Sequence, residues 1–286
     1  MAVFGVGSYA TSKHGTGAAD VYNRNTVNLR SGFENAGYNV TTNSGYWDAV
    51  RAAFDARFTL TTRNIDYASV EQALTAETVQ PSVATDTAVY IVTRGWTGGI
   101  DKSRGPGCFE LSETEQQNLR LGASTYEHVV VVLNTGSVFG TSFYDGINGS
   151  VSDPADGQAL DAILLAGLPG QQVGNAIVDV LDGTVNPSGK VTDTWASTYD
   201  HYPAAATFSD HDGITDTRST PRGYTSVPLL RLFLPSSRFG SSLGRRGASF
   251  DPEWAGSPLT HGRGAGFAGT FRGTFRGRWP LVTALL

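Results

Sequence analysis

The segment spanning residues 161–190 constrains the fold more than any other part of this sequence, because it specifies a strand, a turn and a helix in succession. Residues 161–166 form a short apolar run of buried-strand length, and Gly and Pro residues in 167–170 interrupt it with turn chemistry. Apolar residues then recur at i, i+3, i+4, i+7 and i+8, which predicts a helix with a single apolar face. These residues are Val173, Ala176, Ile177, Val180 and Leu181.

The end of this helix is also marked in the sequence. Gly183 stands where a left-handed C-terminal cap is expected, and the Asn-Pro-Ser-Gly of residues 186–189 predicts a tight turn. By itself the pattern indicates one strand–helix unit of an α/β sheet and names no function.

Strand and helix patterns alternate along the preceding part of the chain as well. The first two predicted strands and the helix between them form a βαβ unit, and Ser112 with Glu115 forms a capping box that predicts a later helix. The alternation favours an α/β sandwich, a mostly parallel sheet with helices on both faces. The other predicted strands are 2–5, 38–42, 88–93 and 129–133, with helices over 26–36 and 46–58 and a glycine-rich loop over 8–23.

Charge divides the chain into two parts of different composition. Residues 1–217 carry 11 Lys and Arg against 24 Asp and Glu, whereas residues 218–286 carry ten Arg, no Lys and only two acidic residues. We therefore predict an α/β domain over residues 1–217 and a poorly structured basic tail over 218–286. Three interpretations of the tail stay open: an arm that binds nucleic acid, a solvated segment without a role, and the product of a shifted reading frame.

Composition excludes several other classes of protein. Cys108 is the single cysteine, which excludes an intrachain disulfide and a cysteine-based metal site. The sequence has no run of 18 apolar residues, and Met1 leads directly into a predicted strand without a basic segment or a cleavage site. Export and membrane insertion are thus unsupported, and a cytoplasmic location is expected by default.

The literal sequence of residues 169–191, PGQQVGNAIVDVLDGTVNPSGKV, resembles the signature PGQxxGxAIxDVLxGxxNPSGKL of family 3 glycoside hydrolases. In that family the signature belongs to the α/β domain that follows the catalytic barrel. The resemblance implies a β-glucosidase-like enzyme, which hydrolyses O-glycosyl bonds of terminal β-glucosides or oligosaccharides without a cofactor. It also implies a (β/α)₈ barrel as the partner of this domain in the complete enzyme.

The family resemblance favours the reading-frame interpretation of the tail. Family members continue near this point with a segment like YRYFDSF. One set of codons for residues 227–233, VPLLRLF, encodes YRYFDS when it is read one base later. The nucleotide sequence of the gene tests this interpretation.

The glycine-rich loop after the first predicted strand is a candidate sugar site. Residues 13–21, KHGTGAADV, resemble a KGGTGSGDV-like loop that borders the sugar in the family, with His14 and Ala18 as departures. Ligands also bind at the carboxyl ends of strands in open α/β sheets. The resemblance implies five sugar-contacting residues, and a connection without a ligand is the alternative. These residues are Lys13, His14, Gly15, Thr16 and Gly17.

Catalysis needs groups that the next candidate loop does not supply. Retaining glycosidases use two carboxylates about 5 Å apart, and many family members take the acid/base Glu from a loop patterned like SRxxGEGxDR. Here residues 93–102 read TRGWTGGIDK, which places Gly98 where the Glu is expected. Gly98 cannot donate a proton, so no catalytic residue is predicted. The resemblance implies sugar contacts from Arg94, Trp96, Asp101 and Lys102, although Trp96 suits a core role equally well.

The catalytic nucleophile is expected outside this chain. In the family it is an Asp of the barrel, which takes about 250 residues. The part that resembles the family already uses residues 2–208, so we expect the barrel before Met1 or after Leu286 and a chain that is inactive alone. Two alternatives are a non-catalytic carbohydrate-binding or interaction module, and an inert gene fragment that folds poorly and exposes apolar surface.

Two further patterns are weaker. The G-x-G-x-x-A outline of residues 5–10 lacks the adjoining helix and the acidic residue after the second strand that a dinucleotide site needs. Residues 198–213, rich in Asp and His, are more typical of a solvated segment than of a metal site. No metal, nucleic acid or membrane partner is therefore expected.

Overall fold

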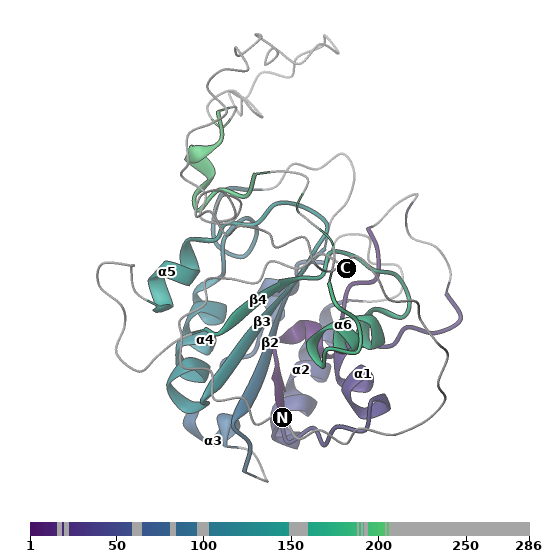
Figure 1. Ribbon diagram of the computed structural model, residues 1–286. Coiled ribbons are helices and arrows are strands. Elements are labelled where there is room, and N and C mark those ends of the chain that lie inside the picture. Colours follow the sequence, from purple (N-terminus) through teal and green to yellow (C-terminus); the bar gives the residue numbers. More distant parts are fainter. Residues whose placement is uncertain are drawn as a thin grey trace, which may run out of the picture.

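The computed structural model describes most of the chain as far as residue 205 (Figure 1). In this part, four parallel strands form one sheet in the order β1-β2-β3-β4, which confirms the predicted mostly parallel α/β fold. The predicted tail and Ser188 of the predicted turn lie outside the described residues. The described residues are 1–15, 19, 23–58, 65–80, 84–95, 103–148, 160–187, 189, 191, 194–203 and 205.

The two long strands lie at the centre of the sheet. β2 (Thr87–Arg94) and β3 (His128–Thr135) pair along their whole length. β1 (Ala2–Phe4) pairs with β2, and β4 (Ala162–Leu165) pairs with β3. Most of the strand residues are buried, because helices cover both faces. This burial explains why the strands appear in the sequence as continuous apolar runs.

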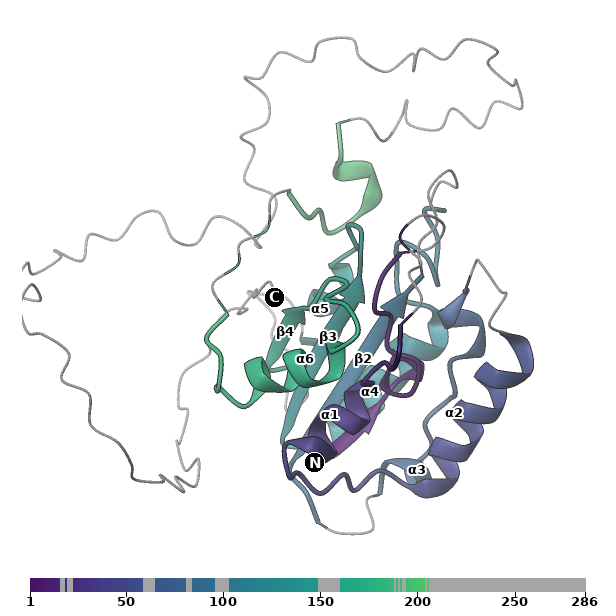
Figure 2. The same cartoon turned by 90° about the vertical axis from the view of Figure 1, so that its right-hand side faces the viewer.

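Alternate strand residues enter two separate cores, one on each face of the sheet. Tyr90 and Leu133 belong to the core that α4 and α5 cover. Ile91 and Val132 belong to the opposite core, and Figure 2 shows α1 and α6 side by side over that face. The helices are α1 (Leu29–Asn35), α2 (Ser44–Arg57), α3 (Ala76–Val79), α4 (Glu113–Thr125), α5 (Ser142–Asn148) and α6 (Val173–Leu181), with 3₁₀ turns at Val6–Ser8, Tyr67–Val70 and Tyr199–His201.

Capping residues determine where the helices begin. The Asn28 side chain accepts the N–H three residues further on, so α1 begins at Leu29, later than predicted. Asn43 caps α2 in the same way. The predicted capping box of Ser112 and Glu115 is confirmed at the start of α4.

The strand predicted over residues 38–42 is wrong, and with it the predicted βαβ unit. This segment runs beside β1 without becoming a strand of the sheet. The Thr42 hydroxyl accepts from the Val3 N–H at 2.7 Å and donates to the Val3 carbonyl at 2.9 Å. The Thr42 side chain thus occupies the two backbone groups of Val3 that a neighbouring strand would use. The strand that pairs with β1 is β2.

Helices α1 and α6 approach each other closely because both contain glycine. A Cβ atom on Gly32 would lie 2.3 Å from the carbonyl oxygen of Gly174, and one on Gly174 would lie 2.0 Å from that of Asn28. Side chains of any size at these positions would push the two helices apart. Gly174 belongs to the signature segment, so packing against α1 gives a structural reason for the Gly at that place in the pattern. Gly183, just past the end of α6, has a φ of 80°, which confirms the predicted left-handed cap.

The described surface exposes few large apolar side chains. Within the described ranges, only Tyr38 and Val185 are large hydrophobic residues with exposed fractions of 37% and 48%. The apolar surface expected of a poorly folding fragment is therefore not found in that part of the chain. None of the described helices combines the length and the apolar character that crossing a membrane requires.

We predict that Gly174→Ala destabilises the domain by about 1–3 kcal/mol, because the added methyl group overlaps the chain before α1. The matched control is Gly122→Ala in α4, where an added Cβ would meet nothing within 4 Å and where Ala is the better helix former. Urea unfolding of both variants measures the difference. Equal stability of the two variants would contradict the close packing of α1 and α6.

Candidate functional site

Loops from all four strands meet at the carboxyl edge of the parallel sheet, where open α/β proteins bind their ligands. Lys13, His14 and Gly15, three of the predicted sugar contacts, follow β1 and are half-buried. The Nδ1 atom of His14 contacts the carbonyl oxygen of Gly15. Thr16 and Gly17 lie outside the described residues. The structure therefore places the start of the predicted sugar loop at the expected edge.

Asn134, near the end of β3, joins the loop after β1, the loop after β4 and the end of β2. Its side chain is fully buried, with 0% exposed. The Oδ1 atom accepts from the Ser12 N–H at 2.7 Å and from the Thr93 hydroxyl at 3.3 Å. The Nδ2 group donates to the carbonyls of Ser12 at 2.9 Å and Gly167 at 2.7 Å. The carboxamide therefore uses all of its hydrogen-bonding positions within the protein.

The signature segment holds both ends of the loop that carries the predicted sugar contacts. At one end, the Gly170 N–H donates to the Lys13 carbonyl at 2.8 Å. At the other, the Val27 N–H donates to the Gln171 carbonyl and the Gly174 N–H donates to the Val27 carbonyl, both at 2.9 Å. The Pro-Gly-Gln turn thus anchors the loop after β1 to the start of α6.

Arg94, a predicted sugar contact, is buried and bonded within the protein. Its two terminal nitrogens each lie 2.7 Å from an oxygen of Glu115. The remaining N–H groups donate to the carbonyls of Thr93, Cys108 and Glu110 at 3.0–3.2 Å. All five N–H groups thus have acceptors in the chain, which differs from the sugar contact expected from the sequence. We interpret Arg94 as the residue that holds the base of the loop after β2.

The other predicted contacts of this loop cannot be placed. Trp96, Asp101 and Lys102 lie outside the described residues, as does Gly98 at the expected acid/base position.

A second buried carboxyl group lies beside the loop after β1. Glu71 accepts from the Val6 N–H at 2.8 Å, and the Asn118 amide donates to Glu71 at 3.4 Å and to the Tyr90 hydroxyl at 3.1 Å. The pKa of Glu71 is raised from 4.5 to about 8, chiefly by burial and next by the nearby Glu115 carboxylate. No sequence pattern predicts this cluster, because its members come from four separate segments.

The segment 194–205 packs over the loop after β2. The Tyr199 ring meets the Phe109 ring edge-on at 5.4 Å between centroids. The Arg104 guanidinium lies 4.6 Å from the centre of the Tyr199 ring, and its Nη1 lies 3.3 Å from Asp200. In the described part of the chain, no three His, Cys, Asp or Glu side chains are grouped to hold a metal ion. The described contacts of this segment with the loop are ring packing, a cation–π contact and one ion pair.

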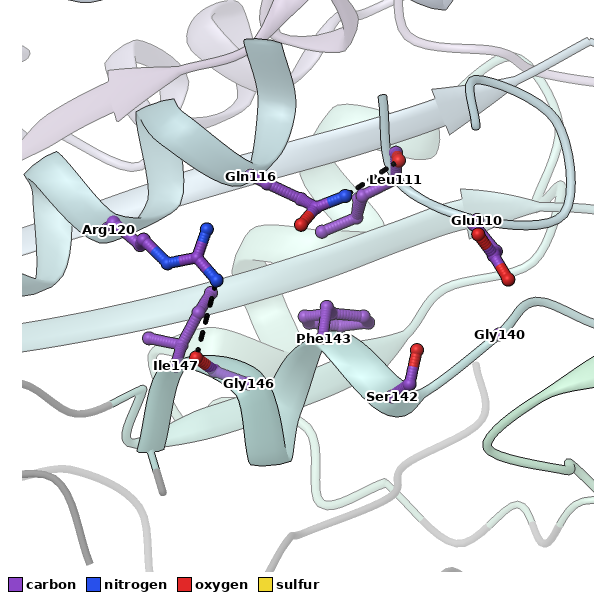
Figure 3. Close-up of a pocket in the computed structure, with 9 residues that line it drawn as sticks. All are labelled: Glu110, Leu111, Gln116, Arg120, Gly140, Ser142, Phe143, Gly146 and Ile147. Atoms are coloured by element: carbon purple, nitrogen blue, oxygen red, sulfur yellow. Dashed lines mark hydrogen bonds between the residues drawn. The ribbon is translucent and has the colours of Figure 1, made fainter. Parts of the chain in front are cut away.

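Glu110 carries a carboxylate at the end of the loop after β2. It lines a small cavity between α4 and α5 (Figure 3). The cavity has a volume of about 100 Å³. Arg120 on α4 donates to the Gly146 carbonyl on α5 at 3.4 Å and closes one end, while Glu110 and Ser142 lie at the other. Glu110 thus lines one end of the space between the two helices.

Comparison with known proteins extends these observations. The sequence profile described as the Glycosyl hydrolase family 3 C-terminal domain matches residues 1–230. The chain is 40% identical over 87 residues to probable beta-glucosidase A of Emericella nidulans, which is 30% of this chain and 9% of that protein. It is 31% identical over 110 residues to beta-glucosidase A of Butyrivibrio fibrisolvens, which is 38% of this chain and 12% of that protein.

Solved structures give the same result. Beta-glucosidase 3B of Thermotoga neapolitana in complex with glucose superposes with a TM-score of 0.56 and 25% identity, over 71% of this chain and 28% of that one. A beta-glucosidase of Paenibacillus barengoltzii superposes with a TM-score of 0.59 and 26% identity, over 72% of this chain and 22% of that one. The chain therefore spans about a tenth of these relatives by sequence and about a quarter of these structures.

The chain is an α/β domain with a parallel sheet and anchored loops at its carboxyl edge, the edge at which open α/β sheets bind ligands. Because the profile match covers most of the sequence, this chain belongs to the family of glycosyl hydrolase family 3 C-terminal domains. The match extends past residue 217, where the predicted domain ends.

The raised pKa of Glu71 predicts a pH dependence of stability. The folded chain keeps this proton up to about pH 8, whereas the unfolded chain releases it near pH 4.5, so this group's contribution falls as pH rises between those values. The slope approaches about 1.4 kcal/mol per pH unit within the window. Glu71→Gln should remove this slope in urea unfolding between pH 4.5 and 8. The exposed Glu77→Gln is the control, and a slope unchanged in Glu71→Gln would contradict the assignment.

The buried ion pair gives a second prediction. Arg94→Met leaves Glu115 buried without its partner and should cost about 3–5 kcal/mol of unfolding free energy. Adding Glu115→Leu should recover part of that loss, because the unpaired charge is gone. Arg51→Met breaks an exposed pair with Asp48 and should cost less than about 1 kcal/mol. Additive losses in the double variant would contradict direct coupling of Arg94 and Glu115.

Proposed function

We propose that this chain is the non-barrel domain of a β-glucosidase-like hydrolase and that its carboxyl-edge loops contribute contacts to a terminal β-glucoside. Membership of the family supports this proposal, since the relatives that match are named beta-glucosidases. The short coverage of those relatives supports a domain of a larger enzyme. The catalytic barrel of that enzyme is the partner we propose for this domain.

The observation that carries the proposal is the anchoring of the loop after β1. The signature segment fixes Lys13 from one side and Val27 from the other. Holding both ends of a loop lowers the entropic cost of ordering that loop around a ligand. In the Thermotoga protein, the matching structure was determined with glucose bound. We therefore assign Lys13, His14, Gly15, Thr16 and Gly17 to sugar binding.

The loop after β2 completes the proposed contacts. Trp96 offers a ring face for stacking against the sugar, and Asp101 and Lys102 offer hydrogen bonds to its hydroxyl groups. The Arg94 guanidinium binds the carbonyls of Cys108 and Glu110, in the segment that follows these residues in the chain. The Tyr199 ring packs on Arg104 of that segment.

Binding without catalysis is the activity we propose for the chain by itself. No Glu lies between Thr93 and Phe109, and Gly98 takes the position of the acid/base. Loss of a general acid/base typically lowers the rate by a factor of about 10²–10⁴. The nucleophile is proposed to reside on the barrel. A carbohydrate-binding role is therefore the second function that the loop sequence favours.

Two measurements on the purified chain test these proposals. Glucose and cellobiose should produce a saturable change in tryptophan fluorescence, whereas aryl β-glucosides should release no nitrophenol above a buffer blank. Lys13→Ala should weaken glucose binding at least tenfold. Arg51→Ala, which removes a cation from an exposed helix surface, should leave it unchanged. Absence of binding in the native chain contradicts the sugar site, and turnover contradicts the predicted inactivity.

A further inference from the structure

We infer that Asn134 is a positioning residue of the sugar site, which sets the loop after β1 against the loop after β4. This inference rests on the proposed function, because the loop that Asn134 holds carries the proposed contact Lys13. Asn134 itself is fully buried and has no hydrogen-bonding position left for a ligand. It acts on the sugar only through the main chain it binds.

The bonding pattern of Asn134 resembles the pairing of one strand with another. Its carboxamide accepts from the N–H of Ser12 and donates to the carbonyl of the same residue. β1 ends at Phe4, so no strand residue of β1 lies beside this part of the sheet. The Asn134 side chain therefore ties the loop after β1 directly to β3, across the end of β2.

A closed ring of hydrogen bonds and main chain links the Asn134 side chain to Lys13. Asn134 binds Ser12, the neighbouring Lys13 carbonyl accepts from Gly170, and the Gly167 carbonyl of the same turn accepts from Asn134. The ring contains the main chain of two loops and one buried side chain. Displacing Asn134 would therefore release the loop that carries Lys13 and the turn before α6 together.

The contact with β2 adds a steric constraint on the same loop. Thr93 lies opposite Asn134 in the sheet register and donates to its Oδ1. A Cβ atom on Gly7 would lie 1.9 Å from the Thr93 hydroxyl oxygen, so only glycine lets the turn after β1 rest on this pair. Thr11 continues the connection, because its hydroxyl accepts from the first N–H of α1 at 2.9 Å.

Asn134→Asp tests the role with little change in shape. The substitution replaces the donating Nδ2 group by a carboxylate oxygen, which would face the two carbonyls of Ser12 and Gly167. Asn148→Asp is the matched control. Asn148 makes the same paired contact with the N–H and carbonyl of Leu160, but at the amino end of β4.

The experiment compares hydrogen exchange and glucose affinity in the full chain and both variants. Asn134→Asp should accelerate amide exchange at Ser12 and Gly170 and raise the Kd for glucose at least tenfold. Asn148→Asp should accelerate exchange at Leu160 and leave the Kd within about twofold. A tenfold change in Kd corresponds to about 1.4 kcal/mol of binding free energy. If Asn134→Asp does not fold, the uncharged Asn134→Ser takes its place in both measurements.

Each result decides a separate statement. Native exchange rates at Ser12 and Gly170 in Asn134→Asp would overturn the inference that Asn134 holds the two loops. Faster exchange with an unchanged Kd, or an equal loss of affinity in Asn148→Asp, would overturn its link to the sugar. A native chain that binds no glucose would contradict the proposed function and the sugar-positioning role, while the exchange rates would still decide whether Asn134 holds the two loops.

Discussion

The close contact between Gly174 and the chain just before α1 is the constraint on which the site depends. It lets α6 lie directly against α1, so that the two helices cover one face of the sheet. The same approach brings the Gly174 N–H to the Val27 carbonyl and fixes the far end of the loop after β1. Helix packing and loop position thus both depend on the absence of a Cβ atom at position 174, which gives a structural reason for the Gly at this place in the signature segment.

Buried polar groups hold the loop after β2 in place, as the signature segment holds the loop after β1. The Arg94 guanidinium holds three carbonyls and one carboxylate in a space that water does not reach. A buried charge is costly unless every partner is present, so this arrangement tolerates few alternative positions of the loop. The neutral Glu71 beside it keeps the total charge of the interior low. Rigid surroundings of this kind suit a loop with the sugar-binding role that we propose.

The sequence predicts the sheet better than the contacts between its loops. Apolar runs and capping residues such as Ser112 indicate strands and helices from neighbours in sequence, and these predictions hold. Residues 38–42 have the composition of a strand, yet the Thr42 hydroxyl, and not a strand backbone, bonds to the N–H and carbonyl of Val3. No periodic pattern in the sequence reveals this contact. The roles of Arg94 and Asn134 depend on partners many positions away along the chain. Family resemblance locates the loop of Lys13 but says nothing of what holds it.

The contact of Thr42 with β1 also has a consequence for the chain in solution. A free sheet edge presents unpaired N–H and carbonyl groups that can recruit a strand from another molecule and start aggregation. At β1, Thr42 occupies both groups of Val3, and Thr41 donates to the carbonyl of Met1. This edge therefore offers little template for intermolecular pairing. A domain that is made or released apart from its larger enzyme keeps that protection, because it is built from residues next to the first strand and needs no second domain.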